Sequence, residues 1–183
     1  MNWLGELVQQ YVSDNDTVIS LGCGILQEIT GLQCKNFTGV DIYPPYVEKL
    51  KNKGINAICA DVTKYNFNPG KFDIVLALDV LEHLNYRDAF KLIKKMKTIS
   101  NKKVIVYTPS TFFDNIDVNW KGKKQNIFEW MENDKNSVWK GLGVNKYQEH
   151  KCFLPERRLN KLGFITSKNN PDKNIFGVWD KND

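Results

Sequence analysis

The stretch VISLGCG, residues 18–24, is the strongest local signal of the fold in this 183-residue chain. With Thr17 it forms a short run rich in β-branched residues that ends in two glycines, Gly22 and Gly24. A buried strand that stops in a glycine turn before a helix is the opening of a nucleotide-binding α/β unit. The stretch therefore predicts a strand at Thr17–Leu21, then a glycine loop and a helix.

Signals for strands and helices alternate on both sides of this stretch. Apolar and β-branched runs predict further strands at Phe37–Ile42, Asn56–Ala60, Phe72–Leu78 and Lys103–Tyr107. Apolar residues at helical spacing predict helices at Trp3–Val12, at about Tyr46–Lys53 and in the lysine-rich stretch with Phe90, Ile93 and Met96. This alternation implies a parallel sheet with right-handed crossovers.

The end of the chain departs from the alternation. Gly163–Lys168 and Asn174–Asp180 both have the composition of strands, and only residues 169–173 separate them. A parallel crossover needs about a dozen residues or more, so these two strands must be antiparallel neighbours. The expected fold class is therefore α/β, a three-layer sandwich with helices on both faces of a mostly parallel sheet.

The composition limits the classes of function. A chain of this length fits one domain, with one active site or none. The net charge of +5 is modest and spread along the chain, so nucleic-acid binding is possible but not favoured. The N-terminal residues do not resemble a signal peptide, and no apolar stretch approaches membrane-spanning length. We therefore expect a soluble cytoplasmic protein with no membrane association.

The cysteines and histidines carry no local metal-binding pattern. Only two histidines occur, His83 and His150, and the four cysteines form no CxxC pair. The cysteines are Cys23, Cys34, Cys59 and Cys152. We expect reduced structural thiols and no metal site.

Five motifs occur in order along the chain: VISLGCG after the first strand, GVDIY at the end of the second, ADV after the third, FDIVLALDVLEHL at the fourth, and NKYQEHKCFLPERRLNKLGF before the sixth. In these motifs the chain resembles a class I S-adenosylmethionine-dependent methyltransferase, of the small single-domain kind similar to type 11. They follow the family's order and spacing over essentially the whole chain. The resemblance implies a seven-stranded sheet of order 3-2-1-4-5-7-6 whose last strand is antiparallel.

The spacing of the glycines and Asp41 suits this cofactor. An acid that holds ribose hydroxyls is expected about 20 residues after the glycines, and Asp41 follows Gly22 by 19. A dinucleotide would require G-x-G-x-x-G, which is incomplete here, whereas S-adenosylmethionine has no phosphate to cradle. The cofactor-binding residues implied by the resemblance are Leu21, Gly22, Cys23, Gly24, Asp41, Ile42, Tyr43, Asp61, Val62, Leu78 and Asp79. Among these, Asp61 would accept from the adenine amino group while Ile42 and Val62 pack on the ring.

The Pro44-Pro45-Tyr46 sequence raises a separate question. A Pro-Pro-aromatic motif is catalytic in amino-methyltransferases, but there it follows the fourth strand. Here it follows the second strand, and proline is well suited to the first turn of a helix. We therefore interpret it as the start of a helix.

Candidates for a general base are Glu82, His83 and His150, because histidine titrates near neutral pH and Glu82 adjoins it. The alternative is structural: Glu82 and His83 would open or cap the following helix, and His150 would make a packing contact. Methyl transfer depends above all on in-line geometry, since the cofactor already carries the activated group. Both interpretations stay open.

The long segment at about Thr111–Glu149 is expected to control substrate choice, because long connections in compact domains are usually functional lids or disordered. It is rich in aromatic residues, which would form either a lid over a planar or apolar substrate or a small satellite core. These residues are Phe112, Phe113, Trp120, Phe128, Trp130, Trp139 and Tyr147.

The expected function is therefore methyl transfer from S-adenosylmethionine to a small or medium-sized acceptor. One alternative is an RNA or protein methyltransferase, which would need an open, basic rim around the strand ends. Another is a non-catalytic S-adenosylmethionine-binding module. It is suggested by Ser20 and Leu26, which stand where the family usually has an acid and a third glycine.

Overall fold

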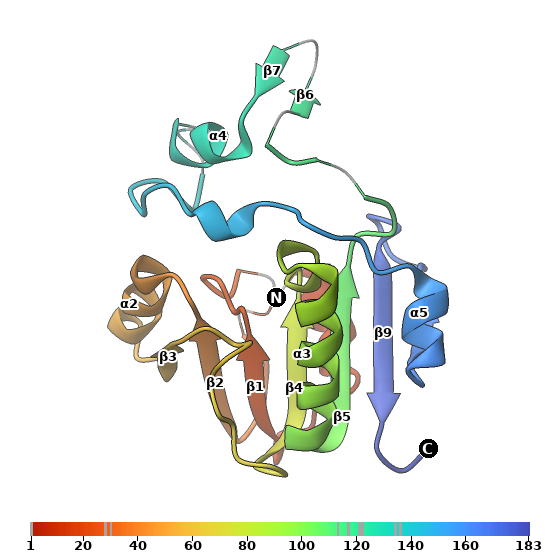
Figure 1. Ribbon diagram of the computed structural model, residues 1–183. Coiled ribbons are helices and arrows are strands. Elements are labelled where there is room, and N and C mark those ends of the chain that lie inside the picture. Colours follow the sequence, from red (N-terminus) through yellow and green to blue (C-terminus); the bar gives the residue numbers. More distant parts are fainter. Residues whose placement is uncertain are drawn as a thin grey trace.

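A seven-stranded sheet of order β3-β2-β1-β4-β5-β9-β8 forms the centre of the computed structural model (Figure 1). The structure describes residues 2–27, 29, 31–112, 114–116, 118–120, 123–133, 135 and 137–183. The strands are β1 (Thr17–Leu21), β2 (Asn36–Asp41), β3 (Ala57–Cys59), β4 (Phe72–Leu78), β5 (Ser100–Thr108), β8 (Ile165–Ser167) and β9 (Ile175–Asp180). Counted within the sheet alone, this is the predicted order 3-2-1-4-5-7-6.

The pairing confirms the predicted reversal at the end of the chain. β1 to β5 pair in parallel, with Ser20 of β1 between Gly39 of β2 and Leu76 of β4. β9 is antiparallel to both β5 and β8. The short connection between β8 and β9 leaves no length for a crossover, so the two strands form a hairpin.

Helices cover both faces of the sheet, as predicted. The helices beside it are α1 (Trp3–Gln9), α2 (Pro44–Asn52), α3 (Tyr86–Ile99) and α5 (Glu156–Lys161). Ile93 of α3 and Leu159 of α5 pack with Ile19 of β1 on one face. α1 and α2 pack on the other face, where Val18 points. Successive β1 residues thus enter opposite cores, as the pleat of a doubly covered strand requires.

The start of α2 settles the structural role of the two prolines. Pro44 occupies the first position of α2 and Tyr43 is its N-cap. A missing N–H costs nothing there, because the first backbone donors of a helix have no partner within it. Pro44 and Pro45 therefore begin a helix, as the sequence predicted.

The predicted helix after the glycine loop is not formed in the described part of residues 22–35. This part of the chain consists of turns, and Gly22, Gly24 and Leu26 all have positive φ. Leu26 and Ile29 are buried in the core beneath α1 and α2. Left-handed backbone at alternate positions interrupts a right-handed helix, and burial of the apolar side chains holds the turns in place.

The segment between β5 and α5 lies over the carboxyl ends of the parallel strands (Figure 1). It contains β6 (Val118–Trp120), β7 (Lys123–Gln125), α4 (Ile127–Asn133) and the short 3-10 helix η2 (Lys146–Gln148). Phe113, and the side chains of Trp120 and Trp130, lie outside what the structure describes. None of the described helices combines the length and the apolar character that crossing a membrane would require.

Candidate cofactor site

A cavity of about 280 Å³ lies where the first four strands end. Each of these strands supplies part of its lining, as expected for ligand sites at the carboxyl edge of an open α/β sheet. From the strand ends, the lining residues are Gly22, Asp41, Ile42, Ala60, Asp61, Val62, Asp79 and Val80. The cavity therefore combines carboxylates with apolar side chains.

Asp41 connects the end of β2 with the glycine loop. Its Oδ2 accepts from the backbone N–H of Gly24, and its Oδ1 accepts from that of Tyr43, each at 2.9 Å. The residue is only 5% exposed, and burial raises the pKa of Asp41 despite these hydrogen bonds. Each carboxylate oxygen has two lone pairs, so Asp41 retains acceptor capacity toward a ligand.

Asp61 is held in a turn after β3. Its Oδ1 accepts from both the N–H and the hydroxyl of Thr63, at 2.9 and 2.6 Å. Its Oδ2 lies 3.2 Å from Nζ of Lys64. Burial acts to raise the pKa of Asp61, but the bonds from Thr63 and Lys64 outweigh it and hold that pKa below its usual value. Asp61 is therefore an ionised acceptor.

The remaining predicted cofactor residues stand behind or beside the lining. Leu21 and Leu78 are buried in the two cores, and Cys23 packs under Gly39. Gly24 faces the ring of Trp139, because a Cβ at Gly24 would lie 3.4 Å from it. These positions shape the loop or the core.

Tyr43 reaches away from the cavity toward the segment above it. Its hydroxyl donates to the carbonyl of Leu142 at 2.7 Å, and Lys49 donates to the carbonyl of Val138 at 2.9 Å. The ring of Tyr46 packs on that of Trp139, with centroids 5.0 Å apart. α2 therefore holds the chain around residues 138–143 over the glycine loop.

The following part of this segment forms one wall of the cavity. It lies largely within the segment at about Thr111–Glu149 that was expected to cover a substrate, but Tyr147 is its only lining residue named individually from the sequence. Its lining residues are Asn145, Tyr147, Gln148 and Lys151. Asn145 is 3% exposed, and its side chain hydrogen-bonds with that of Tyr46. Only the fold places these residues opposite Asp41 and Asp61.

Asp79 and Glu82 follow β4 and lie at the inner end of the cavity. Asp79 lines it and has φ +50°, a strained value for a residue with a side chain. Glu82 is buried behind it, hydrogen-bonded to the carboxyl of Asp79 and to the hydroxyl of Thr108 at 3.1 Å. Burial raises the pKa of Glu82 to about 7 against these bonds.

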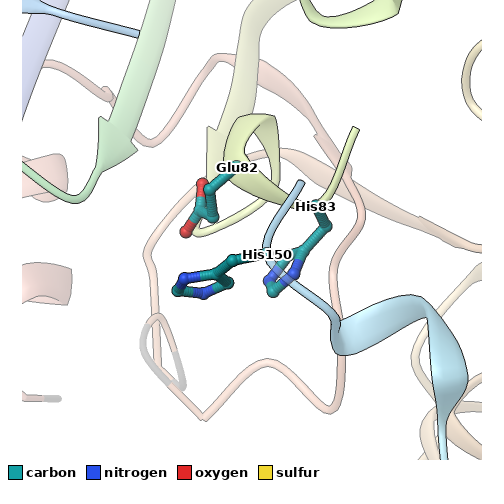
Figure 2. Close-up of side chains that lie close together, drawn as sticks. All are labelled: Glu82, His83 and His150. Carbon is teal, nitrogen blue, oxygen red and sulfur yellow. The ribbon is translucent and has the colours of Figure 1, made fainter. Parts of the chain in front are cut away.

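The structure brings the three predicted general-base candidates together. Glu82 and His83 belong to the short 3-10 helix η1 (Leu81–His83), and His150 approaches them from the segment after η2 (Figure 2). The ring centroids of His83 and His150 are 5.0 Å apart. Burial, and then the neighbouring His150, lower the pKa of His83 to about 4. A ring with that pKa is a weak base at neutral pH, which disfavours His83 as the general base.

The lining fits the adenosine part of S-adenosylmethionine. Ile42 and Val62 supply apolar surface for a base, and Asp41 and Asp61 supply acceptors for hydroxyl and amino groups. Gly22 lets a ligand approach the backbone closely, because it has no side chain. A side chain would not fit there, since φ is +68° and a Cβ would lie 2.6 Å from Val80. The residues present therefore suit a ligand with hydroxyl and amino donors and a planar ring.

Comparison with known proteins supports this assignment. A profile of the methyltransferase domain matches residues 19–106, from β1 through most of β5. The uncharacterised protein MJ0638 of Methanocaldococcus jannaschii is 28% identical over 115 residues, which cover 58% of this chain and 51% of that protein. N-methyltransferase 4 of Papaver somniferum is 31% identical over 102 residues, 49% of this chain and 27% of that protein. The chain thus spans only about half and about a quarter of these relatives.

A solved structure shows the same fold over nearly the whole chain. The magnesium protoporphyrin IX methyltransferase of Synechocystis PCC 6803, with bound S-adenosylmethionine, has a TM-score of 0.58 and 14% identity. The match covers 96% of this chain and 76% of that chain. The sheet order and the reversed β9 define a class I methyltransferase fold. With the profile match, these similarities are consistent with a class I S-adenosylmethionine-dependent methyltransferase domain.

Proposed function

We propose that this chain binds S-adenosylmethionine in the cavity at the strand ends and transfers its methyl group to a small or medium-sized acceptor. The observation that carries the proposal is the placement of Asp41, Asp61 and Asp79 around one cavity with Ile42 and Val62. The acceptor would enter beneath the wall formed by the segment around residues 145–151.

Each lining residue has a role that its contacts support. Asp41 would accept from the ribose hydroxyls, with its orientation fixed by the N–H groups of Gly24 and Tyr43. Asp61 would accept from the adenine amino group, while Ile42 and Val62 pack on the ring. Asp79 would face the methionine part, where a carboxylate suits a positively charged group. The cofactor supplies an activated methyl group, so the protein mainly orients donor and acceptor.

The two departures from the family pattern are compatible with cofactor binding. Ser20 is 2% exposed within β1, and Leu26 is 6% exposed in the core under α2. Neither side chain lines the cavity.

Calorimetric titration of the purified protein with S-adenosylmethionine and S-adenosylhomocysteine tests the first half of the proposal. We expect both to bind, NADH not to bind, and Asp41→Ala to abolish binding. The matched control is Asp14→Ala, which removes the same charge from an exposed turn. Absence of binding in the wild type would refute the assignment.

Turnover is tested separately with methyl-labelled cofactor and fractionated cell extract. Label in the small-molecule fraction would support the proposed acceptor class. Label in RNA or protein would establish the macromolecular alternative instead. Cofactor binding without label in any fraction would identify a non-catalytic module.

A further inference from the structure

His83 and His150, the two histidines of the sequence, lie next to the buried side chain of Glu82. One ligand atom each of Glu82, His83 and His150 lies within 4.8 Å of the others. Figure 2 shows both rings gathered beneath the Glu82 carboxylate. We propose that Glu82, His83 and His150 bind a divalent first-row transition metal ion next to the cofactor cavity.

The backbone fixes this arrangement. Glu82 and His83 are consecutive, so His150 is the residue that must be brought in. The N–H groups of Lys151 and Cys152 both donate to the Glu82 carbonyl, at 2.7 and 3.1 Å. The N–H of His150 donates to Asn115 Oδ1 at 2.9 Å. The approach of His150 is therefore part of the fold, because its own N–H and the N–H groups of the two residues after it are all hydrogen-bonded.

Two of the three side chains have neighbours that suit metal ligands. His83 Nδ1 lies 3.2 Å from the carbonyl oxygen of Glu149. A carbonyl can only accept, so this contact favours the tautomer with the hydrogen on Nδ1, in which Nε2 has a lone pair that an ion could bind. Metal-bound histidines characteristically donate their second N–H to such a group. Thr108 similarly donates to Oε2 of Glu82, which orients the carboxylate.

The donor set determines the class of ion. Two imidazoles and one carboxylate are the protein ligands of many catalytic zinc and non-haem iron sites, which leave further positions open. Hard ions such as Mg²⁺ prefer all-oxygen sites. Ligand atoms on a tetrahedral ion lie roughly 3.3 Å apart when the bonds are about 2.0–2.1 Å. The ligand atoms lie within 4.8 Å of one another, so metal binding would require the side chains to rotate toward the ion.

The ion has a route of entry and a place next to the reaction. His83 and Asp79 both line the cavity, and the Asp79 carboxyl hydrogen-bonds with that of Glu82. An open coordination position would therefore face the cavity, where water or an oxygen of the acceptor can bind. The metal site goes beyond the proposed function and does not depend on it, because ion binding is measured without S-adenosylmethionine.

The test is a titration of the chelator-treated, dialysed protein with Co²⁺. The visible absorption spectrum of bound Co²⁺ depends on which groups coordinate it. We expect one ion per chain, displacement by Zn²⁺ and no displacement by Mg²⁺ at equal concentration. In His150→Ala the affinity should fall about 100-fold or more, since loss of even an outer partner typically costs 10–100-fold. His83→Ala should behave in the same way.

Two controls keep the outcome decisive. Cys59→Ser removes an exposed thiol, the most accessible alternative ligand, and should leave Co²⁺ binding unchanged. Circular dichroism of the histidine variants excludes unfolding, and His150→Asn is the fallback if His150→Ala is unfolded. Co²⁺ binding that survives in both folded histidine variants, that is lost in Cys59→Ser, or that Mg²⁺ displaces would overturn the proposal. Failure of the cofactor titration would leave this result unaffected.

Discussion

The carboxylate of Asp41 accepts a hydrogen bond from the backbone N–H of Gly24, with 2.9 Å between Oδ2 and N. This bond joins the end of β2 to the glycine loop after β1, beside the cavity that Asp41 and Gly22 line. The residue predicted to hold the cofactor ribose therefore also orders the loop beside it. Substitutions at Asp41 should affect both binding and loop order.

Cofactor binding should depend on pH through Asp41. Burial raises the pKa of this carboxyl above its usual 3.8, so the protonated form appears at a higher pH than for an ordinary aspartate. Protonation removes acceptor capacity, and the affinity for S-adenosylmethionine should therefore fall as the pH is lowered. Calorimetry over a pH series measures this dependence. Asp41→Asn should bind at least about tenfold more weakly, because hydrogen bonds to charged groups contribute about 1.5–3 kcal/mol, and should lack the acidic decline. The same decline in Asp41→Asn would exclude this carboxyl as its source.

Gly22→Ala should destabilise the fold through two separable effects. The left-handed backbone costs a residue with a Cβ about 1–2 kcal/mol. The new Cβ would also lie 2.6 Å from a methyl carbon of Val80, and overpacking adds about 1–3 kcal/mol. Urea denaturation measures the free energy of unfolding.

The matched control for this substitution is Gly54→Ala. Gly54 has φ +75°, and apart from chain neighbours a Cβ there meets no described heavy atom within 4 Å. Gly54→Ala should lose only the free energy of unfolding that the left-handed backbone costs. Adding Val80→Ala to Gly22→Ala should restore part of the lost stability. Equal losses in the two glycine variants would contradict the predicted contact with Val80.

Tyr43→Phe should loosen the segment over the glycine loop. The substitution removes the hydroxyl that donates to Leu142 and keeps the ring on Tyr46. We expect a loss of about 0.5–1.5 kcal/mol in stability and faster amide hydrogen exchange in residues 137–149. Tyr65→Phe, an exposed tyrosine on another part of the surface, should change neither. Unchanged exchange in Tyr43→Phe would show that other contacts hold the segment.

Asp16→Asn should reduce stability at neutral pH more than in acid. Burial acts to raise the pKa of Asp16, but bonds from Lys102 and the Ser13 N–H outweigh it and lower that pKa. A lowered folded-state pKa stabilises the protein above the ordinary value of 3.8, and this contribution is lost as the pH falls through the folded-state value. Urea denaturation along a pH series should show wild type and Asp16→Asn converging in acid. A constant difference would contradict this, and the exposed Asp14→Asn serves as control.

Much of the fold could be predicted from local patterns alone. The strands at Thr17–Leu21 and Phe72–Leu78 have the predicted bounds. A parallel strand that is covered on both faces needs a continuous apolar run, and turn residues mark where each run ends. The terminal hairpin followed from chain length, and the beginning of α2 from proline chemistry. In each case the residues that allow the prediction lie within or next to the element that they predict.

Other features depend on contacts between distant parts of the chain. The turns after Gly24 replace a helix because Leu26 and Ile29 are buried against α1 and α2, and helical propensity does not include that energy. Asn145 lines the cavity only because the segment is held by α2. His83 contacts the carbonyl of Glu149, 66 residues away, so its neighbour His150 could not be placed beside Glu82 from spacing.

Local patterns were enough to predict the sheet, its reversed strand and the position of Asp41 at the strand ends, because periodicity and chain length act locally. Packing between distant segments determines which side chains close the cavity, and it brings Glu82, His83 and His150 into one cluster. Such a cluster depends on packing and main-chain hydrogen bonds between segments, which leave no local trace in the order of residues.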